Sequence, residues 1–183
     1  MGALQELALC LDAEERTLRR AVSQGTVRAR RPGPRRLHLA DGESEYLQGH
    51  WALLAELRRT LRTQRNVRLA VLYGSVARGE EDEGSDLDLL VSLAAGRPSA
   101  TSRLAASLEA IASRPVDVAL LSRVEARAPL LLARVLDEGR VIVDRDGQWP
   151  ALRARRRSIR ARADRSHRRQ MAAAARAISE LAS

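Results

Sequence analysis

Apolar residues recur every three or four positions in five stretches of the chain, the spacing that lines one face of a helix. These stretches predict helices over residues 5–11, 14–23, 46–64, 99–112 and 129–138. Short apolar runs and alternating patterns predict strands over residues 68–73, 86–93, 115–121 and 141–144. From residue 67 onward, strands therefore alternate with helices. This order predicts an α+β (α/β-like) domain built on a small mixed sheet.

The first 45 residues follow a different pattern. Gly25 comes just past the second predicted helix, a position that suits a C-cap. Apolar and polar residues then alternate on both sides of a Pro-Gly-Pro sequence, which predicts a hairpin with its prolines confined to the turn. Two helices in a tight turn followed by a basic hairpin resemble a winged helix-turn-helix. We expect this domain over residues 1–45 and a connecting helix over 46–66, in which Trp51 packs in the core.

Arginines cluster on the second helix and on the hairpin, the two elements of such a domain that would touch a duplex. The candidate nucleic-acid-binding residues are Arg16, Thr17, Arg19, Arg20, Arg28, Arg30, Arg31, Arg35 and Arg36. The alternative is a small helical cap whose arginines are merely solvated. The clustering favours contact with DNA or RNA.

Positive charge is concentrated at the C-terminal end of the chain. The formal net charge is +9, and residues 151–183 contain ten arginines and two acidic residues. Strong helix formers predict an arginine-rich C-terminal helix over residues 147–183. This helix either contacts the phosphate backbone of RNA or DNA or packs against an acidic partner. Both interpretations stay open.

The composition and the N-terminal sequence indicate the cellular compartment of the protein. A single cysteine, Cys10, excludes an internal disulfide and fits a reducing compartment. The N-terminus lacks the basic segment and apolar run of a secretory signal. No apolar run approaches the roughly 20 residues that a membrane span needs. We therefore expect a cytoplasmic protein with no membrane partner.

The most informative stretch begins at Gly74-Ser75, directly after the first strand of the later domain. Glycine lets the backbone approach a ligand closely, and Ser75 begins a short helix whose free N–H groups favour phosphate. Asp86 and Asp88 lie two residues apart on the next predicted strand, so both side chains emerge on one face. Two adjacent carboxylates repel each other unless a cation lies between them, and Mg²⁺ favours such oxygen ligands. The stretch predicts a site for phosphate and metal.

A third carboxylate, Asp117, lies on a neighbouring predicted strand and could point to the same face. Three carboxylates beside a phosphate-binding turn indicate two-metal chemistry on a nucleoside triphosphate. One ion would hold the triphosphate through Asp86 and Asp88, and a second, with Asp117 added, would activate an acceptor hydroxyl. The alternative is that these acids are surface residues of the strands or an inactive site. The intact Gly-Ser turn favours a nucleotide site.

The residues Gly74-Ser75, ten further residues and Asp86-Leu87-Asp88 match the GS-x10-D-x-D signature of the polymerase-β-like nucleotidyltransferases. The wider sequence GSVARGEEDEGSDLDLLV resembles the minimal nucleotidyltransferases, which in bacteria often pair with HEPN-domain proteins in toxin–antitoxin modules. The resemblance implies a nucleotidyltransferase core over residues 67–146. It also implies ATP or another nucleoside triphosphate as substrate, two Mg²⁺ ions, and a HEPN-domain protein as partner.

Site residues follow from the same resemblance. The nucleotide-binding residues are Gly74, Ser75, Arg78 and Ser85, and the catalytic and metal-binding residues are Asp86, Asp88 and Asp117. Arg78 could reach a phosphate or pair with a nearby acid and fix the turn, and we favour the pairing slightly. Ser85 is expected to cap the loop before the second strand. The acidic run at residues 80–83 is expected to be a solvated loop.

Three functions from different classes are compatible with these features. The first is Mg-dependent transfer of a nucleoside monophosphate, AMP from ATP, to a hydroxyl of a protein partner, as a toxin–antitoxin component that also binds DNA. The second is the same transfer to RNA, such as a tRNA end. The third is a DNA-binding regulator with a sensory or inactive nucleotidyltransferase domain. The carboxylates favour the first two, the basic tail the second, and the winged-helix-like region the third.

Overall fold

The computed structural model describes residues 3–33, 36–94 and 98–181, and the side chains of residues 4–30, 37–94 and 100–178. The helices are α1 (Ala3–Cys10), α2 (Glu15–Gln24), α3 (Glu43–Thr63), α4 (Gly74–Arg78), α5 (Pro98–Ala112), α6 (Leu121–Arg127), α7 (Pro129–Glu138), α8 (Gln148–Ala154) and α9 (Arg156–Leu181). The strands are β1 (Ala29–Gly33), β2 (Arg36–Leu39), β3 (Val67–Tyr73), β4 (Leu87–Leu93), β5 (Val116–Leu120) and β6 (Arg140–Asp144). None of the helices in these ranges is long and apolar enough to cross a membrane.

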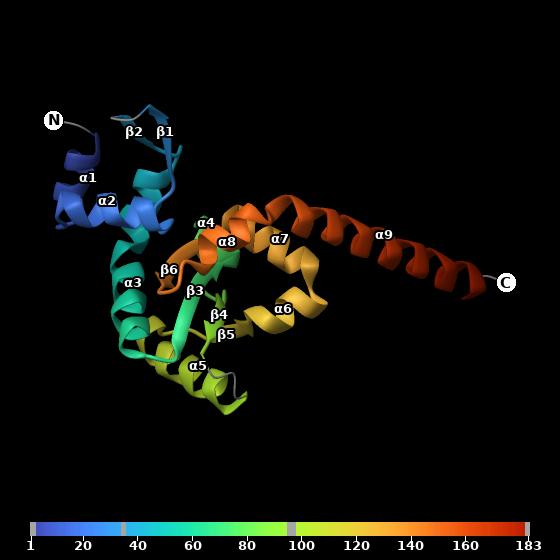
Figure 1. Ribbon diagram of the computed structural model, residues 1–183. Coiled ribbons are helices and arrows are strands. Elements are labelled where there is room, and N and C mark those ends of the chain that lie inside the picture. Colours follow the sequence, from blue (N-terminus) through green and yellow to red (C-terminus); the bar gives the residue numbers. More distant parts are fainter. Residues whose placement is uncertain (1–2, 34–35, 95–97, 182–183) are drawn as a thin grey trace.

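A four-stranded mixed sheet forms the centre of the molecule (Figure 1). The strand order is β5-β4-β3-β6, with β3 antiparallel to both of its neighbours and β4 parallel to β5. The parallel pair requires a crossover, which α5 supplies between β4 and β5. The expected α+β fold with a small mixed sheet is confirmed.

Helices cover both faces of this sheet, and the sheet divides the hydrophobic core into two clusters. Alternate residues of β3 belong to different clusters, because successive side chains of a strand point to opposite faces. Ala70 and Leu72 pack with residues of α3 and α5, whereas Leu69 and Val71 pack with residues of α6, α7 and α8. The face covered by α6 and α7 also carries the candidate site.

The N-terminal part packs on the free edge of β6. The hydroxyl of Thr26 donates a hydrogen bond to the carbonyl oxygen of Val141. The Val141 N–H in turn donates to the carbonyl oxygen of Gly25, with 3.1 Å between N and O. An exposed strand edge invites pairing with another chain, so these bonds cover a vulnerable part of the sheet. Gly25, with φ +84°, caps the C-terminal end of α2, as the sequence predicts.

Most sequence-predicted elements are present with shifts of a few residues. The hairpin forms as an antiparallel pair, although Pro32 lies within β1 and not in the turn. The short helix expected to begin at Ser75 includes Gly74 and ends at Arg78, because Gly79 takes a left-handed φ of +76°. The helices, the hairpin and their order are compatible with a winged-helix-like domain, which stays a prediction.

Two elements differ from the predictions. Residues 121–127 form the short helix α6, where the sequence predicted only the end of a strand. The tail is also not one continuous helix, because it breaks at Arg155 between α8 and α9. Trp149 and Leu152 of α8 are buried, whereas α9 is exposed along residues 171–178 and projects from the rest of the molecule (Figure 1).

Candidate functional site

The turn after β3 brings the backbone against the carboxylate of Asp88. Gly74 has φ +77°, a backbone conformation that residues with a Cβ atom rarely adopt. A Cβ atom at this position would lie 2.1 Å from Asp88 Oδ2. Glycine is therefore required here both by the backbone conformation and by the close approach. The Gly-Ser turn and Asp88 form one structural unit.

Asp88 has a polar neighbour on each side in the sheet. It pairs in register with Tyr73 of β3 and with Asp117 of β5. Its neighbours in sequence, Leu87 and Leu89, are buried on the opposite face, so Asp88 points to the face covered by α6 and α7. The structure thus brings Asp88 and Asp117 together as predicted. Asp86 is exposed and lies one residue before β4 begins, not on the strand itself.

These three acids, the carboxylate cluster (Asp86, Asp88 and Asp117), repel one another. Burial raises the pKa of Asp88, and the negative charges of Asp117 and Asp86 raise it further. Burial, followed by the charges of Asp88 and Asp117, also raises the pKa of Tyr73 to about 12. The site therefore disfavours negative charge until a cation arrives.

A magnesium ion fits the chemistry of this cluster. Carboxylate oxygens are hard ligands of the kind that Mg²⁺ prefers, and a cation would relieve the crowding around Asp88. Within residues 3–33, 36–94 and 98–181, no group of three or more His, Cys, Asp or Glu side chains is arranged to hold a metal ion. An ion at this cluster would complete its coordination shell with phosphate oxygens of a nucleotide and with water.

Arg78 pairs with two acids at the end of α4. Its Nε donates to Glu80 Oε2 at 2.6 Å and its Nη1 donates to Glu138 Oε2 at 3.0 Å. Of the two roles open from the sequence, the structure shows the pairing that fixes the turn. Because Glu138 ends α7, the contact also joins α4 to the helix that covers this face of the sheet.

Ser85 closes the loop before β4, as the sequence predicts. Its hydroxyl donates to Asp82 Oδ1 at 2.8 Å and accepts the Asp82 N–H at 3.0 Å. Asp82 Oδ1 also accepts the N–H of Gly84 at 3.1 Å. These bonds, with Ser85 the first cause, lower the pKa of Asp82. The loop is thus organised by its own side chains.

The acidic run beside this loop is not uniformly solvated. Glu81 is partly buried, and its Oε1 lies 2.5 Å from Nε2 of His50 on α3. The His50 ring stacks on Tyr46, with 4.2 Å between ring centroids. The expectation of a solvated run is therefore wrong for Glu81. The contact ties the loop to α3.

A buried ion pair, Glu43–Arg140, lies at the C-terminal end of α4, away from the Gly-Ser turn. The two side chains are 2% and 1% exposed, and they are joined by hydrogen bonds of 2.6 and 3.0 Å. Arg140 Nε also donates to the carbonyl oxygen of Ala77 in α4 at 2.7 Å, and its guanidinium lies 3.4 Å from the centroid of the Tyr46 ring. Sequence reasoning missed this pair because its partners are 97 residues apart.

The predicted nucleic-acid-binding residues with described side chains lie in different surroundings. Arg16 and Arg19 form ion pairs with Glu14 and Glu15 on the exposed side of α2. Arg28 points inward, where its Nη2 donates to the carbonyl oxygens of Ala77, at 3.1 Å, and of Glu138. Thr17 and Arg20 line a cavity between α2 and α3, and Arg30 is exposed. Arg31, Arg35 and Arg36 lie outside the residues whose side chains are described.

Sequence comparison identifies the class of protein. Residues 55–148 match the family model of the polymerase beta nucleotidyltransferases. The matched segment includes the Gly-Ser turn and the carboxylate cluster. The chain belongs to this family and is a nucleotidyltransferase. A search of curated protein sequences found no match.

Solved structures share the fold of the core. A chain of a toxin–antitoxin crystallised with AMP-PNP is 19% identical, with a TM-score of 0.56 over 66% of this chain and 97% of that chain. A chain of a mutant MntA–HpeT toxin–antitoxin is 17% identical, with a TM-score of 0.53 over 67% and 96%. A third belongs to a tri-AMPylated Shewanella oneidensis HEPN toxin in complex with MNT antitoxin, at 15% identity and a TM-score of 0.50 over 66% and 98%. The fold is that of the toxin–antitoxin nucleotidyltransferases.

Proposed function

We propose that this nucleotidyltransferase moves AMP from ATP to a hydroxyl group of a protein partner. The observation that carries the proposal is the packing of the Gly74 turn against Asp88, with Asp117 in register on the adjacent strand. In support, the Gly-Ser turn lies beside carboxylates that form no ion pair among the described residues, because Arg78, whose charge acts on Asp88, pairs with Glu80 and Glu138. The neighbouring structures that contain AMP-PNP and an AMPylated HEPN toxin support ATP as donor and a HEPN-domain protein as acceptor.

The chain's own residues would orient the reactants. Gly74 and Ser75 would hold the triphosphate through backbone N–H groups and the serine hydroxyl. Asp117, which is exposed, would position the acceptor hydroxyl and take its proton. The acceptor oxygen then bonds to the α-phosphorus, the bond from that phosphorus to the bridging oxygen breaks, and pyrophosphate leaves. Ser85 would act by keeping the loop before Asp86 closed.

Magnesium completes this proposal. Asp86 and Asp88 would hold one ion on the triphosphate, and Asp117 would join them in holding a second. When bound, the ions would neutralise phosphate charge and lower the pKa of the acceptor hydroxyl. The donor set fits this role because it consists of carboxylates only.

An RNA acceptor is the second candidate. The arginines at the free end of α9, Arg165, Arg168, Arg169 and Arg176, are exposed and have no acidic partner among the described residues. Such a row of cations could hold a phosphate backbone. A DNA-binding regulator is the third candidate and depends on the winged-helix-like region alone.

The test is a labelling experiment with α-³²P-labelled ATP, CTP, GTP or UTP and Mg²⁺. Each reaction contains the full-length protein with either a co-expressed HEPN-domain protein or total RNA. Label in the protein fraction supports the proposal, and label in RNA supports the second candidate. The Asp86→Asn/Asp88→Asn variant should abolish labelling, whereas the matched variant Asp41→Asn/Asp164→Asn, altered at two exposed positions, should retain it. Mg-nucleotide binding without any labelling would favour the regulator.

A further inference from the structure

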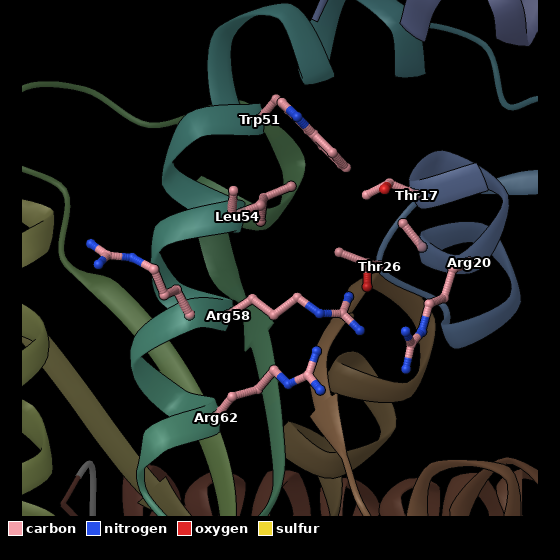
Figure 2. Close-up of a pocket in the computed structure, with 10 residues that line it drawn as sticks. Thr17, Arg20, Thr26, Trp51, Leu54, Arg58 and Arg62 are labelled. Carbon is pink, nitrogen blue, oxygen red and sulfur yellow. The ribbon is translucent and has the colours of Figure 1, made fainter. Parts of the chain in front are cut away.

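A cavity of about 520 Å³ lies between α2 and α3, apart from the carboxylate cluster (Figure 2). Its volume falls within the range of small-molecule sites. The apolar part of the wall comes from Trp51, Leu54 and neighbouring alanines. The polar part comes mainly from arginines. No residue of the carboxylate cluster and no residue of the Gly-Ser turn lines it.

Three arginines face this space with no acid to neutralise them. Figure 2 shows Arg58 and Arg62 of α3 extending toward α2, and Arg20 of α2 extending into the same region. Arg58 bonds to the neutral side chain of Gln24, and none of the three forms an ion pair within the part of the chain described. Burial lowers the pKa of Arg58, and the charges of Arg62 and Arg20 lower it further. An anionic ligand would relieve this repulsion.

Trp51 gives the cavity a second, apolar end. Its indole is partly buried against the core and extends across the cavity toward Thr17 of α2 (Figure 2). Trp51 and Arg58 are seven residues apart on α3, which corresponds to roughly 10 Å along the helix axis. This spacing suits a ligand with an aromatic ring at one end and phosphates at the other.

We propose that this cavity is a second nucleotide-binding site, in which Trp51 contacts the base and Arg20, Arg58 and Arg62 bind the phosphates. The concave shape and finite volume favour a mononucleotide over an extended strand, which would need a continuous groove. The proposal is independent of the catalytic proposal, because it requires neither Mg²⁺ nor Asp88. Thr26, which also lines the cavity, links it to the core through hydrogen bonds to Val141 and Arg140.

Tryptophan fluorescence can test this site directly, because the chain contains two tryptophans. The Trp149→Phe variant leaves Trp51 as the sole reporter. ADP is titrated into this variant in the presence of EDTA, with and without Asp86→Asn/Asp88→Asn. Saturable quenching of Trp51 that is unchanged by the aspartate substitutions supports the site. Absence of saturable quenching, or its loss with the aspartate substitutions, overturns it.

Charge and ring contributions are then separated. Arg58→Gln/Arg62→Gln should weaken ADP binding at least tenfold, and Arg20→Gln on the opposite wall should weaken it severalfold. The matched control is Arg123→Gln/Arg127→Gln on α6, which removes two exposed arginines with the same helical spacing. Circular dichroism melting confirms that each variant folds. An equal loss in the control overturns the proposal.

Competing ligands decide the chemical class. ADP should bind at least tenfold more tightly than pyrophosphate, which lacks the ring, and than adenosine, which lacks the phosphates. Pyrophosphate binding as tight as that of ADP would overturn the assignment to a nucleotide. Stronger competition by a short single-stranded oligonucleotide would likewise overturn it in favour of a nucleic-acid surface.

Discussion

Two charged groups flank the short helix α4, and they differ in how their charges are balanced. The carboxylate cluster, at the start of α4, gathers like charges that no ion pair neutralises within the described residues. The buried ion pair Glu43–Arg140, at the end of α4, matches opposite charges through two hydrogen bonds. Repulsion without compensation costs stability and is retained where a site must receive a cation. The paired charges instead fix the position of α4.

The largest expected effect is on catalysis at the carboxylate cluster. Asp88→Asn should lower nucleotide transfer by at least about 10³-fold, because it removes a metal-binding charge. The same change should raise the free energy of unfolding of the metal-free protein, because it removes a partly buried charge that is repelled by Asp117. Labelling assays and denaturant unfolding in EDTA measure the two effects. Loss of both activity and stability would break the contrast with the buried ion pair.

The buried ion pair should show the opposite response. Glu43→Ala should destabilise the protein by about 3–5 kcal/mol, because it leaves the Arg140 charge buried without a partner. The control Glu56→Ala removes the acid of an exposed pair with Arg59 and should cost at most about 1 kcal/mol. Denaturant unfolding measures both variants. Equal costs would show that burial does not distinguish the pairs.

Gly74→Ala probes the close approach that joins the turn to the cluster. Gly74 and Gly147 both have positive φ, so alanine at either position should cost about 1–2 kcal/mol of stability. A Cβ at Gly147 meets nothing within 4 Å, whereas one at Gly74 would displace Asp88. Transfer activity should therefore fall about 10²-fold for Gly74→Ala only. Similar activity in the two variants would refute a role for the close approach.

The smallest effect is on the two tyrosines, one beside each charged group. Burial raises the pKa of both Tyr46 and Tyr73 to about 12, so the unfolded chain loses these protons first and stability should fall between about pH 10 and 12. Asp88→Asn should lower the pKa of Tyr73 and leave that of Tyr46 unchanged. Ultraviolet titration of tyrosinate, with each tyrosine assigned by its Phe variant, measures the shifts. A shift in Tyr46 would contradict the separation of the two groups.

Sequence patterns predicted the features that depend on local chemistry. Periodicity placed the strands of the sheet and the long helices, and the Gly-Ser turn with its spaced aspartates indicated a nucleotide site. The helix α6 was missed because its seven residues carry only two buried apolar side chains, Leu121 and Val124, too few to show a period. The break at Arg155 was missed because the flanking residues are all good helix formers.

Features that depend on tertiary packing could not be predicted in this way. Charge clustering suggested that Arg28 faces a duplex, yet its guanidinium bonds to carbonyl oxygens of α4 and α7. The sequence also gives no sign that Arg140 would meet Glu43, since each looks like an ordinary charged residue at the start of an element. Only the folded arrangement brings Arg58, Arg62 and Arg20 around one cavity.

The N-terminal part covers the edge of β6, so the protein cannot simply be divided into an N-terminal domain and an independent core. The family match begins at residue 55, inside α3, but Gly25 and Thr26 bond to the edge strand, and Glu43 neutralises Arg140. A fragment of residues 55–148 would leave the edge of β6 uncovered, and it would leave Arg140 without the acid that neutralises it. Such a fragment should self-associate and precipitate on expression. The N-terminal part therefore completes the core, because it covers the edge of β6 and supplies the acid that neutralises Arg140.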